Sequence, residues 1–210
     1  MGWGYGVKKT LHAVERDTEA NQKRRTEYEA AIAAIPPERL IFLDESGVTT
    51  SMTRLYGRCP GGARIREGTP GGRWSVLTML GALSLGGVRA MMTIEAATDG
   101  DIFRAFLGEV LAPRLQAGDV VVLDNLSAHK VAGVREIIQA RGARLLYLPP
   151  YSPDLNPIEK AWSKLKALLR TAKARTNLTL EAAITTSLPL ITAHDAHAWF
   201  RHSGILLQQV

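Results

Sequence analysis

Three short apolar runs divide the chain, at residues 40–43, 120–123 and 145–148. None of them alternates with polar residues, which is typical of strands that are covered on both faces of a sheet. The first run stops at Asp44 and the second at Asp124, whereas the third stops at a pair of prolines. The pattern therefore predicts three buried strands, two of which present an acidic residue where the strand ends.

The rest of the pattern predicts a hairpin and several helices. Residues 74–85 and 88–94 are strand-like, and the Gly86-Gly87 pair between them is a two-residue turn signal. Helical spacing of apolar residues, or charged stretches that end at proline or glycine, predicts helices at residues 15–35, 102–111, 131–140 and from 158 onward. This order of elements predicts an α/β fold with a mixed sheet, in which the hairpin supplies the antiparallel part.

The chain divides into three stretches. Residues 1–14 are interrupted by glycines, and residues 15–35 are charged and alanine-rich, with too little apolar surface for their own core. We therefore interpret residues 1–37 as a linker or docking helix. Residues 38–176 carry the pattern of the main domain, and residues 177–210 are interpreted as a C-terminal helical extension. A length of 210 residues agrees with one domain and a short appendage.

The charge balance points to a polyanionic partner. The chain has 26 lysines and arginines against 20 acidic residues, a formal net charge of +6, which favours nucleic acid. The single cysteine, Cys59, excludes an internal disulfide framework and a cysteine-built metal cluster. No apolar run approaches the roughly 18 residues of a membrane span, and the start lacks a signal-peptide pattern. We therefore expect a cytoplasmic protein that is nucleoid-associated when it binds DNA.

Acidic residues at the strand ends and at one helix start are the candidates for chemistry. Asp44 and Glu45 point to opposite faces of a strand, and the pattern leaves open which of them faces a site. Alone, Asp44 or Asp124 is more simply a turn or cap residue. Glu159, three residues after Asn156, could close a capping box. In combination, however, three acids supply the oxygen ligands that Mg²⁺ or Mn²⁺ prefers.

Three motifs give these acids a family resemblance. They are Leu43-Asp44-Glu45-Ser46-Gly47, then Leu123-Asp124-Asn125 with His129-Lys130, and Pro149-Pro150-Tyr151-Ser152-Pro153-Asp154-Leu155-Asn156-Pro157-Ile158-Glu159. Together they resemble the DDE transposases of bacterial insertion sequences, and most closely the insertion-sequence-630 family of the mariner-like superfamily. Thirty-four residues separate Asp124 from Glu159, which is the spacing of that superfamily. The resemblance covers residues 40–172, and the proline-rich string is its most specific part.

The resemblance implies a ribonuclease-H-like fold and a site for divalent metal, with two Mg²⁺ or Mn²⁺ ions, at Asp44, Asp124 and Glu159. It favours Asp44 over Glu45, and it implies cleavage and joining of transposon DNA by a catalytic domain at residues 38–176. Full-length relatives carry helix-turn-helix modules ahead of this domain, and residues 1–37 resemble only the junction. Either a separate helix-turn-helix polypeptide supplies recognition, or the chain is a truncated remnant.

Basic side chains near the third acid are candidates for DNA binding without choice of sequence. The helix after Glu159 carries Lys160, Lys164, Lys166 and Arg170, and a glycine-rich stretch carries Arg58, Arg64 and Arg66. A solvated charged surface is the alternative interpretation of both sets. His129 could approach a metal ion or a phosphate, but we favour a loop histidine that hydrogen-bonds the backbone.

The predicted partners are transposon ends and target DNA, with a homodimer as the candidate assembly. Two other functions compete with transposition. One is an inactive or domesticated DNA-binding remnant, which the presence of all three acids disfavours. The other is a different ribonuclease-H-like nuclease, such as a resolvase or a hybrid nuclease, which the proline-rich string before Glu159 disfavours.

Overall fold

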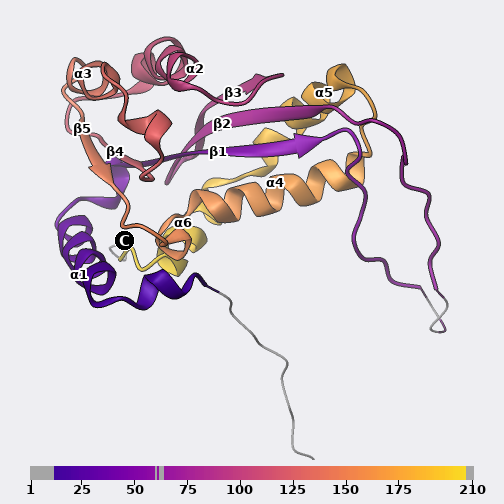
Figure 1. Cartoon of the computed structure of the whole chain (residues 1–210), viewed down its shortest axis with the longest axis horizontal. Coiled ribbons are helices and arrows are strands. Elements are labelled where there is room, and N and C mark those ends of the chain that lie inside the picture. Colours follow the sequence, from indigo (N-terminus) through magenta and orange to yellow (C-terminus); the bar gives the residue numbers. More distant parts are fainter. Residues whose placement is uncertain (1–11, 60, 62–63, 207–210) are drawn as a thin grey trace, which may run out of the picture.

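The computed structural model describes residues 12–59, 61 and 64–206, so the ends of the predicted linker and C-terminal extension lie outside the described residues. A five-stranded mixed sheet lies between two helical layers (Figure 1). The strands are β1 (Leu40–Thr49), β2 (Val76–Ser84), β3 (Gly87–Ile94), β4 (Val120–Leu123) and β5 (Arg144–Tyr147). Their order in the sheet is β3-β2-β1-β4-β5. Strand β2 is antiparallel to its neighbours β1 and β3, whereas β4 is parallel to β1 and β5 is parallel to β4. The predicted mixed sheet with an antiparallel hairpin is confirmed.

Helices cover both faces of this sheet. They are α1 (Glu19–Ala33), α2 (Gly100–Ala105), α3 (Val134–Gln139), α4 (Ile158–Ala172), α5 (Asn177–Ser187) and α6 (Ala193–His202). Helices α2 and α3 lie over one face, and α4 lies along the other with α6 and α1 (Figure 1). The predicted helix at residues 102–111 is helical throughout, but it is α-helical only as far as Ala105 and continues as a π-helix at Phe106–Leu111.

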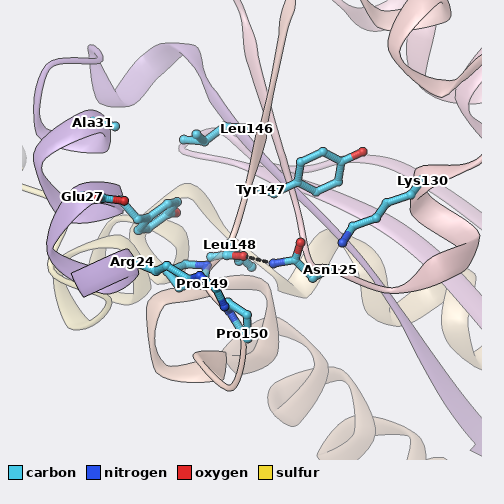
Figure 2. A pocket seen from close by; sticks show the side chains of 11 residues that line it. Arg24, Glu27, Ala31, Asn125, Lys130, Leu146, Tyr147, Leu148, Pro149 and Pro150 are labelled. Carbon is cyan, nitrogen blue, oxygen red and sulfur yellow. Dashed lines mark hydrogen bonds between the residues drawn. The ribbon is translucent and has the colours of Figure 1, made fainter. Parts of the chain in front are cut away.

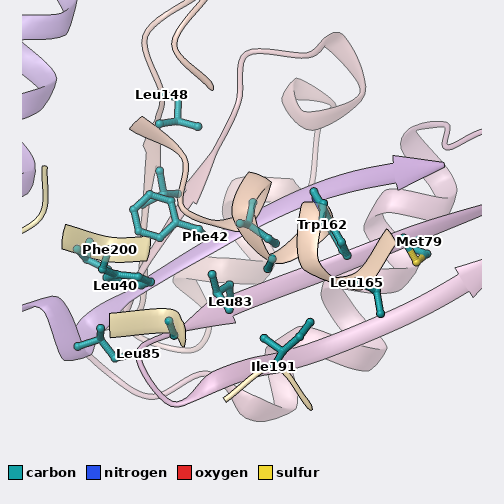
Figure 3. Close-up of a cluster of buried hydrophobic side chains, with 14 of the residues drawn as sticks. Leu40, Phe42, Met79, Leu83, Leu85, Leu148, Trp162, Leu165, Ile191 and Phe200 are labelled. Carbon is teal, nitrogen blue, oxygen red and sulfur yellow. The ribbon is translucent and has the colours of Figure 1, made fainter. Parts of the chain in front are cut away.

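Two apolar cores follow from the alternation of side chains along β1. Phe42 packs toward α4 and α6, where its ring meets that of Phe200 edge to face at 5.3 Å (Figure 3). Leu43, on the opposite face, belongs to the core under α2. Leu180 and Ile184 of α5 are buried in the first core, so residues beyond 176 complete the same hydrophobic layer.

Strand β1 does not end at Asp44, and that sequence expectation was wrong. The strand continues to Thr49, because its backbone stays paired with β2 from Phe42 opposite Leu83 to Thr49 opposite Val76. Asp44 therefore sits within a strand. Strand β4 ends at Leu123 as expected, with Asp124 following directly.

A long connection, here called the arm (the described residues 50–59, 61 and 64–75), projects from the end of β1 and returns into β2 (Figure 1). Polar contacts fix its base to the C-terminal end of α4. The Arg54 Nε atom donates to Thr171 Oγ1 at 3.3 Å, and Lys173 forms an ion pair with Glu67. In the part of the chain that the structure describes, no helix has the length and apolar character needed to cross a membrane.

Candidate active site

Asp44 enters the site from the middle of β1, on the face that α4 covers. Its carboxylate is buried, and Oδ2 accepts a hydrogen bond from Trp162 Nε1 at 3.1 Å. Burial raises the pKa of Asp44 to about 7, and the negative charges of Glu159 and Asp124 raise it as well. Gly81 lies opposite Asp44 on β2, where a Cβ atom would come within 2.5 Å of the Trp162 ring. A glycine at this position thus makes room for the indole that binds the acid.

Asp124 follows β4 directly, and a buried histidine fixes it. The Nδ1 atom of His129 lies 2.5 Å from Asp124 Oδ1, which also accepts the Leu126 N–H at 3.0 Å. Burial alone would raise the pKa of Asp124, but these hydrogen bonds hold it below its usual value. The His129 ring is fully buried and stacks on Phe103, with centroids 4.2 Å apart. The expectation that His129 bonds the backbone was wrong, because its ring binds a carboxylate five residues earlier.

Glu159 is the second residue of α4, and a tight loop delivers it. Tyr151 adopts a left-handed conformation with φ of 55°, and a 3₁₀ turn follows at Pro153–Leu155. Helix α4 is capped at Pro157 without a side-chain hydrogen bond, so the capping box that could have occupied Glu159 does not form. Partial desolvation raises the pKa of Glu159, as does the charge of Asp124, while Lys166 opposes the rise.

The charges of Asp124 and Glu159 raise the pKa of Asp44, and that of Asp124 raises the pKa of Glu159, so the three acids act on one another electrostatically. Glu45 is not among them. Glu45 points to the opposite face of β1. Lys166 lies about two helical turns after Glu159. Burial lowers the pKa of Lys166, whereas the negative charges of Glu159 and Asp44 raise it. Among the described residues, no group of three or more acidic, histidine or cysteine side chains is arranged to hold a metal ion as it stands.

A groove of about 420 Å³ opens between two of the acids. Asp124 and Glu159 line it together with Asn125, Leu126 and the loop residues 148–153. A second hollow of about 510 Å³ shares Asn125 and the prolines of that loop, and Arg24 and Lys130 stand on its opposite sides (Figure 2). Asp124 and Glu159 therefore border an open surface hollow, whereas Asp44 is buried.

The structure divides the basic residues that the sequence grouped together. At 3.6 residues per turn, Lys166 and Arg170 share the flank of α4 that carries Glu159. Lys160 and Lys164 lie about 100–140° away from Glu159 around the axis of α4. Lys164 Nζ forms an ion pair with Asp195 of α6 at 2.6 Å, which fastens α4 to α6. Lys164 thus has a structural partner at a distance from the acids.

The arginines of the arm are also remote from the acids. Arg58, Arg64 and Arg66 are exposed. The arm meets α4 at Thr171, twelve residues or about 18 Å along the helix from Glu159. None of these three arginines is among the charges that shift the pKa of Asp44, Asp124 or Glu159.

Trp162 is the contact that sequence reasoning missed. Its position on the apolar stripe of α4 predicts packing against the sheet, and Trp162 does pack there. Its indole N–H, however, reaches the strand acid, and only the tendency of a buried tryptophan to find an acceptor signals this.

A comparison with protein families matches residues 39–181 to a model described as DDE superfamily endonuclease. Among solved structures, the pre-cleavage Mos1 transpososome is similar with a TM-score of 0.72 and 15% identity, over 97% of this chain and 64% of that one. The mariner Mos1 paired end complex with Mg gives 0.73 and 15%, over 97% and 66%. The catalytic domain of Mos1 mariner transposase gives 0.58 and 13%, over 95% and 91%.

These matches establish the fold. The mixed sheet flanked by helices is the ribonuclease-H-like fold of the Mos1 catalytic domain, as the sequence resemblance implied. The chain spans 64% of the length of the transpososome chain it matches. No curated protein matches the sequence.

Proposed function

The chain belongs to the DDE superfamily of endonucleases, and from this premise we propose that it cleaves and joins DNA strands in the transposition of an insertion sequence. We place it in the insertion-sequence-630 family, which the proline-rich string before Glu159 supports. In this proposal residues 38–176 form the catalytic domain. Residues 1–37 dock on that domain from its junction with a DNA-binding region, and residues 177–210 extend it.

The observation that carries the proposal is that Asp44, Asp124 and Glu159 lie within electrostatic reach of one another, with Asp124 and Glu159 lining one open groove. Asp124 raises the pKa of Asp44 and of Glu159, and such neighbouring carboxylates are a costly arrangement without a cation. Their oxygens suit Mg²⁺ or Mn²⁺. We assign the three acids as ligands of two such ions. When bound, these ions would activate the attacking oxygen and stabilise the leaving oxygen of a phosphoryl transfer. The Mos1 structures named with Mg and with Mn support this choice.

The surrounding residues orient the acids and receive DNA. Trp162 and His129 each hold one carboxylate by a hydrogen bond, which limits the rotamers that Asp44 and Asp124 can adopt. Lys166 and Arg170 share the flank of Glu159, so they would neutralise backbone phosphates beside the cleaved bond. These contacts carry no sequence information. We therefore assign recognition of transposon ends to a helix-turn-helix module, either on a separate polypeptide or preceding these residues, and propose a nucleoid-associated cytoplasmic location.

A homodimer is the assembly we propose, with the arm as the contact surface. Among the described residues, the arm exposes Leu55, Tyr56, Ile65 and Trp74, and the Tyr56 side chain is 90% exposed. Several exposed large apolar side chains on one projecting segment are typical of an association surface. Light scattering across a concentration series should give a dimer for the wild type and a monomer for Leu55→Ser/Tyr56→Ser. A wild type that stays monomeric contradicts this assembly.

The activity is tested on supercoiled plasmid and end-labelled random duplex with Mg²⁺ or Mn²⁺. Asp44→Asn, Asp124→Asn and Glu159→Gln should each lower nicking on the order of 100-fold or more. Glu45→Gln, on the other face of β1, is the matched control and should keep activity. DNA binding should survive in all four variants, measured by mobility shift. Duplex that is bound but never cut by the wild type would favour the inactive DNA-binding remnant.

A further inference from the structure

A buried arginine joins the N-terminal helix to the loop that leads into α4. Arg25 of α1 is only 7% exposed. Its Nη1 atom donates to Ser152 Oγ at 2.7 Å and to Asp154 Oδ1 at 3.1 Å, and its Nη2 atom donates to Asp154 Oδ2 at 2.8 Å. The two-pronged geometry makes this a strong and directional ion pair.

The positive charge of the Arg25 guanidinium is costly to bury, and the carboxylate of Asp154 and the hydroxyl of Ser152 compensate that cost. A guanidinium removed from water destabilises the fold unless it is paired and hydrogen-bonded. Arg16 reinforces the pair through a contact of 3.1 Å to Asp154 Oδ2, and Ser152 Oγ donates onward to the Pro150 carbonyl at 3.0 Å. Two arginines from residues 16–25 thus converge on one short turn.

This turn is coupled rigidly to Glu159. Only four residues lie between Asp154 and Glu159, and two of them, Leu155 and Ile158, have side chains buried in the core. The backbone N–H of Glu159 donates to the Asn156 carbonyl at 3.2 Å. Prolines at positions 153 and 157 remove further backbone freedom. A displacement of the turn would therefore move the start of α4 and the carboxylate that it carries.

Packing alone does not fix α1 in this position. In α1 the buried apolar side chains are those of Tyr28 and Ile32, and most other side chains are polar and exposed. Such a helix has a narrow apolar stripe and could rotate or slide at low cost. The Arg25 fork, whose partners lie 127 and 129 residues further along the chain, selects one orientation.

We propose that Arg25 is a positioning residue for Glu159, and that α1 thereby sets the geometry of the third acid. The inference rests on the proposed role of Glu159 as a metal ligand. It adds that the segment N-terminal to the catalytic domain takes part in building the site. A helix that served only to cover the core would leave metal affinity independent of this contact.

The test measures Mn²⁺ affinity by electron paramagnetic resonance on the full chain without DNA, at a temperature well below unfolding. Arg25→Ala and Asp154→Asn should each raise the Mn²⁺ dissociation constant about tenfold, as outer-sphere changes at metal sites do. Lys23→Ala removes an exposed charge from the same helix and is the matched control, with unchanged affinity expected. The double variant should be no worse than either single variant, because the two residues act through one contact.

A lower unfolding temperature with unchanged Mn²⁺ affinity would overturn the proposal and leave Arg25 a purely structural residue. Additive losses in the double variant would overturn it as well. Where Arg25→Ala fails to fold, Ser152→Ala removes one acceptor of Arg25 together with the hydrogen bond from Ser152 to the Pro150 carbonyl, keeps the Arg25–Asp154 pair, and should still weaken Mn²⁺ binding by a smaller factor. Glu159→Gln separates the two hypotheses. If Glu159→Gln leaves Mn²⁺ affinity intact, the proposed metal site is wrong. If Glu159→Gln weakens Mn²⁺ binding and Arg25→Ala does not, the metal site stands and only the positioning role of Arg25 is wrong.

Discussion

The indole N–H of Trp162 donates a hydrogen bond to Asp44 Oδ2 across 3.1 Å and so joins α4 to the middle of β1. Trp162 lies three residues after Glu159, nearly one turn further along the helix. One helix therefore presents an acid from its first turn and orients a second acid on the neighbouring strand. The relative position of Asp44 and Glu159 depends on how α4 packs against the sheet.

Replacing Trp162 with phenylalanine tests this dependence. Trp162→Phe keeps an aromatic ring in the core but removes the side-chain donor of a buried carboxylate, a cost of about 1–3 kcal/mol. A hydrogen bond to the charged form lowers a carboxyl pKa, so its loss should raise the pKa of Asp44 further above its usual value. The acid limb of the pH–rate profile for DNA nicking should move to higher pH. Trp199→Phe on α6, with its half-buried ring, is the control, and identical profiles for the two variants would contradict the assignment.

Gly81 should tolerate no side chain. The Cβ atom of Gly81→Ala would lie 2.5 Å from the Trp162 ring, so the indole must shift away from the strand. We expect a loss of about 1–3 kcal/mol in the free energy of unfolding, together with a shift in tryptophan fluorescence and reduced nicking. Gly108→Ala is the control, because nothing lies within 4 Å of its Cβ position. Wild-type nicking by Gly81→Ala would show that Asp44 does not need the indole.

Two lysines of α4 should separate stability from DNA binding. Lys166→Ala should weaken all duplexes about equally and reduce the salt dependence of binding by ~0.9 in the log–log slope. Lys164→Ala should leave DNA binding unchanged and lower stability by about 0.5–1 kcal/mol, since it breaks the ion pair with Asp195.

The hydrogen bond from Lys164 lowers the pKa of Asp195 to about 2. This stabilisation should therefore be complete above pH ~4 and disappear as the pH falls toward 2. Filter binding and thermal unfolding measure the two effects, and weaker DNA binding by Lys164→Ala would contradict the division.

Much of the architecture could be predicted, because uninterrupted apolar runs mark buried strands whatever they pair with. The continuation of β1 through Asp44 could not be predicted, since a stretch of polar residues ending in glycine resembles a turn until β2 supplies the backbone partners. The three candidate acids were identified by motif. Their supporting contacts were not, because each depends on tertiary packing. Arg25 lies in a helix whose charged pattern predicts full exposure, and its partners are more than 120 residues away. The ring of His129 stacks on Phe103 and binds Asp124, and both neighbours come together only in the folded chain.

The stability of the metal-free protein should depend on pH through Asp44. Its pKa is raised to about 7 in the folded state, whereas an unfolded aspartate titrates near 3.9. Between these values the folded state binds a proton that the unfolded state does not bind, so this group lowers stability as the pH rises from about 4 to 7 and has a constant effect above that. Asp44→Asn removes the buried charge. In the presence of EDTA it should be more stable than the wild type by roughly 1–3 kcal/mol at pH 8, and this gain should shrink toward pH 5.

Denaturant unfolding at pH 5, 6, 7 and 8 measures the free energy of unfolding of the wild type and of Asp44→Asn. In the difference between the two values, the titrations of all the groups that both proteins share cancel. Asp101→Asn, at an exposed position on α2, is the control and should show no such pH-dependent gain. Mn²⁺ added at pH 8 should stabilise the wild type and leave Asp44→Asn unchanged, because binding to the folded state alone raises stability. An Asp44→Asn protein that is less stable than the wild type at pH 8 without metal would show that the carboxylate supports the fold. The site would then be built for structure, and the cost of its crowded charges could not be taken as the signature of a missing cation.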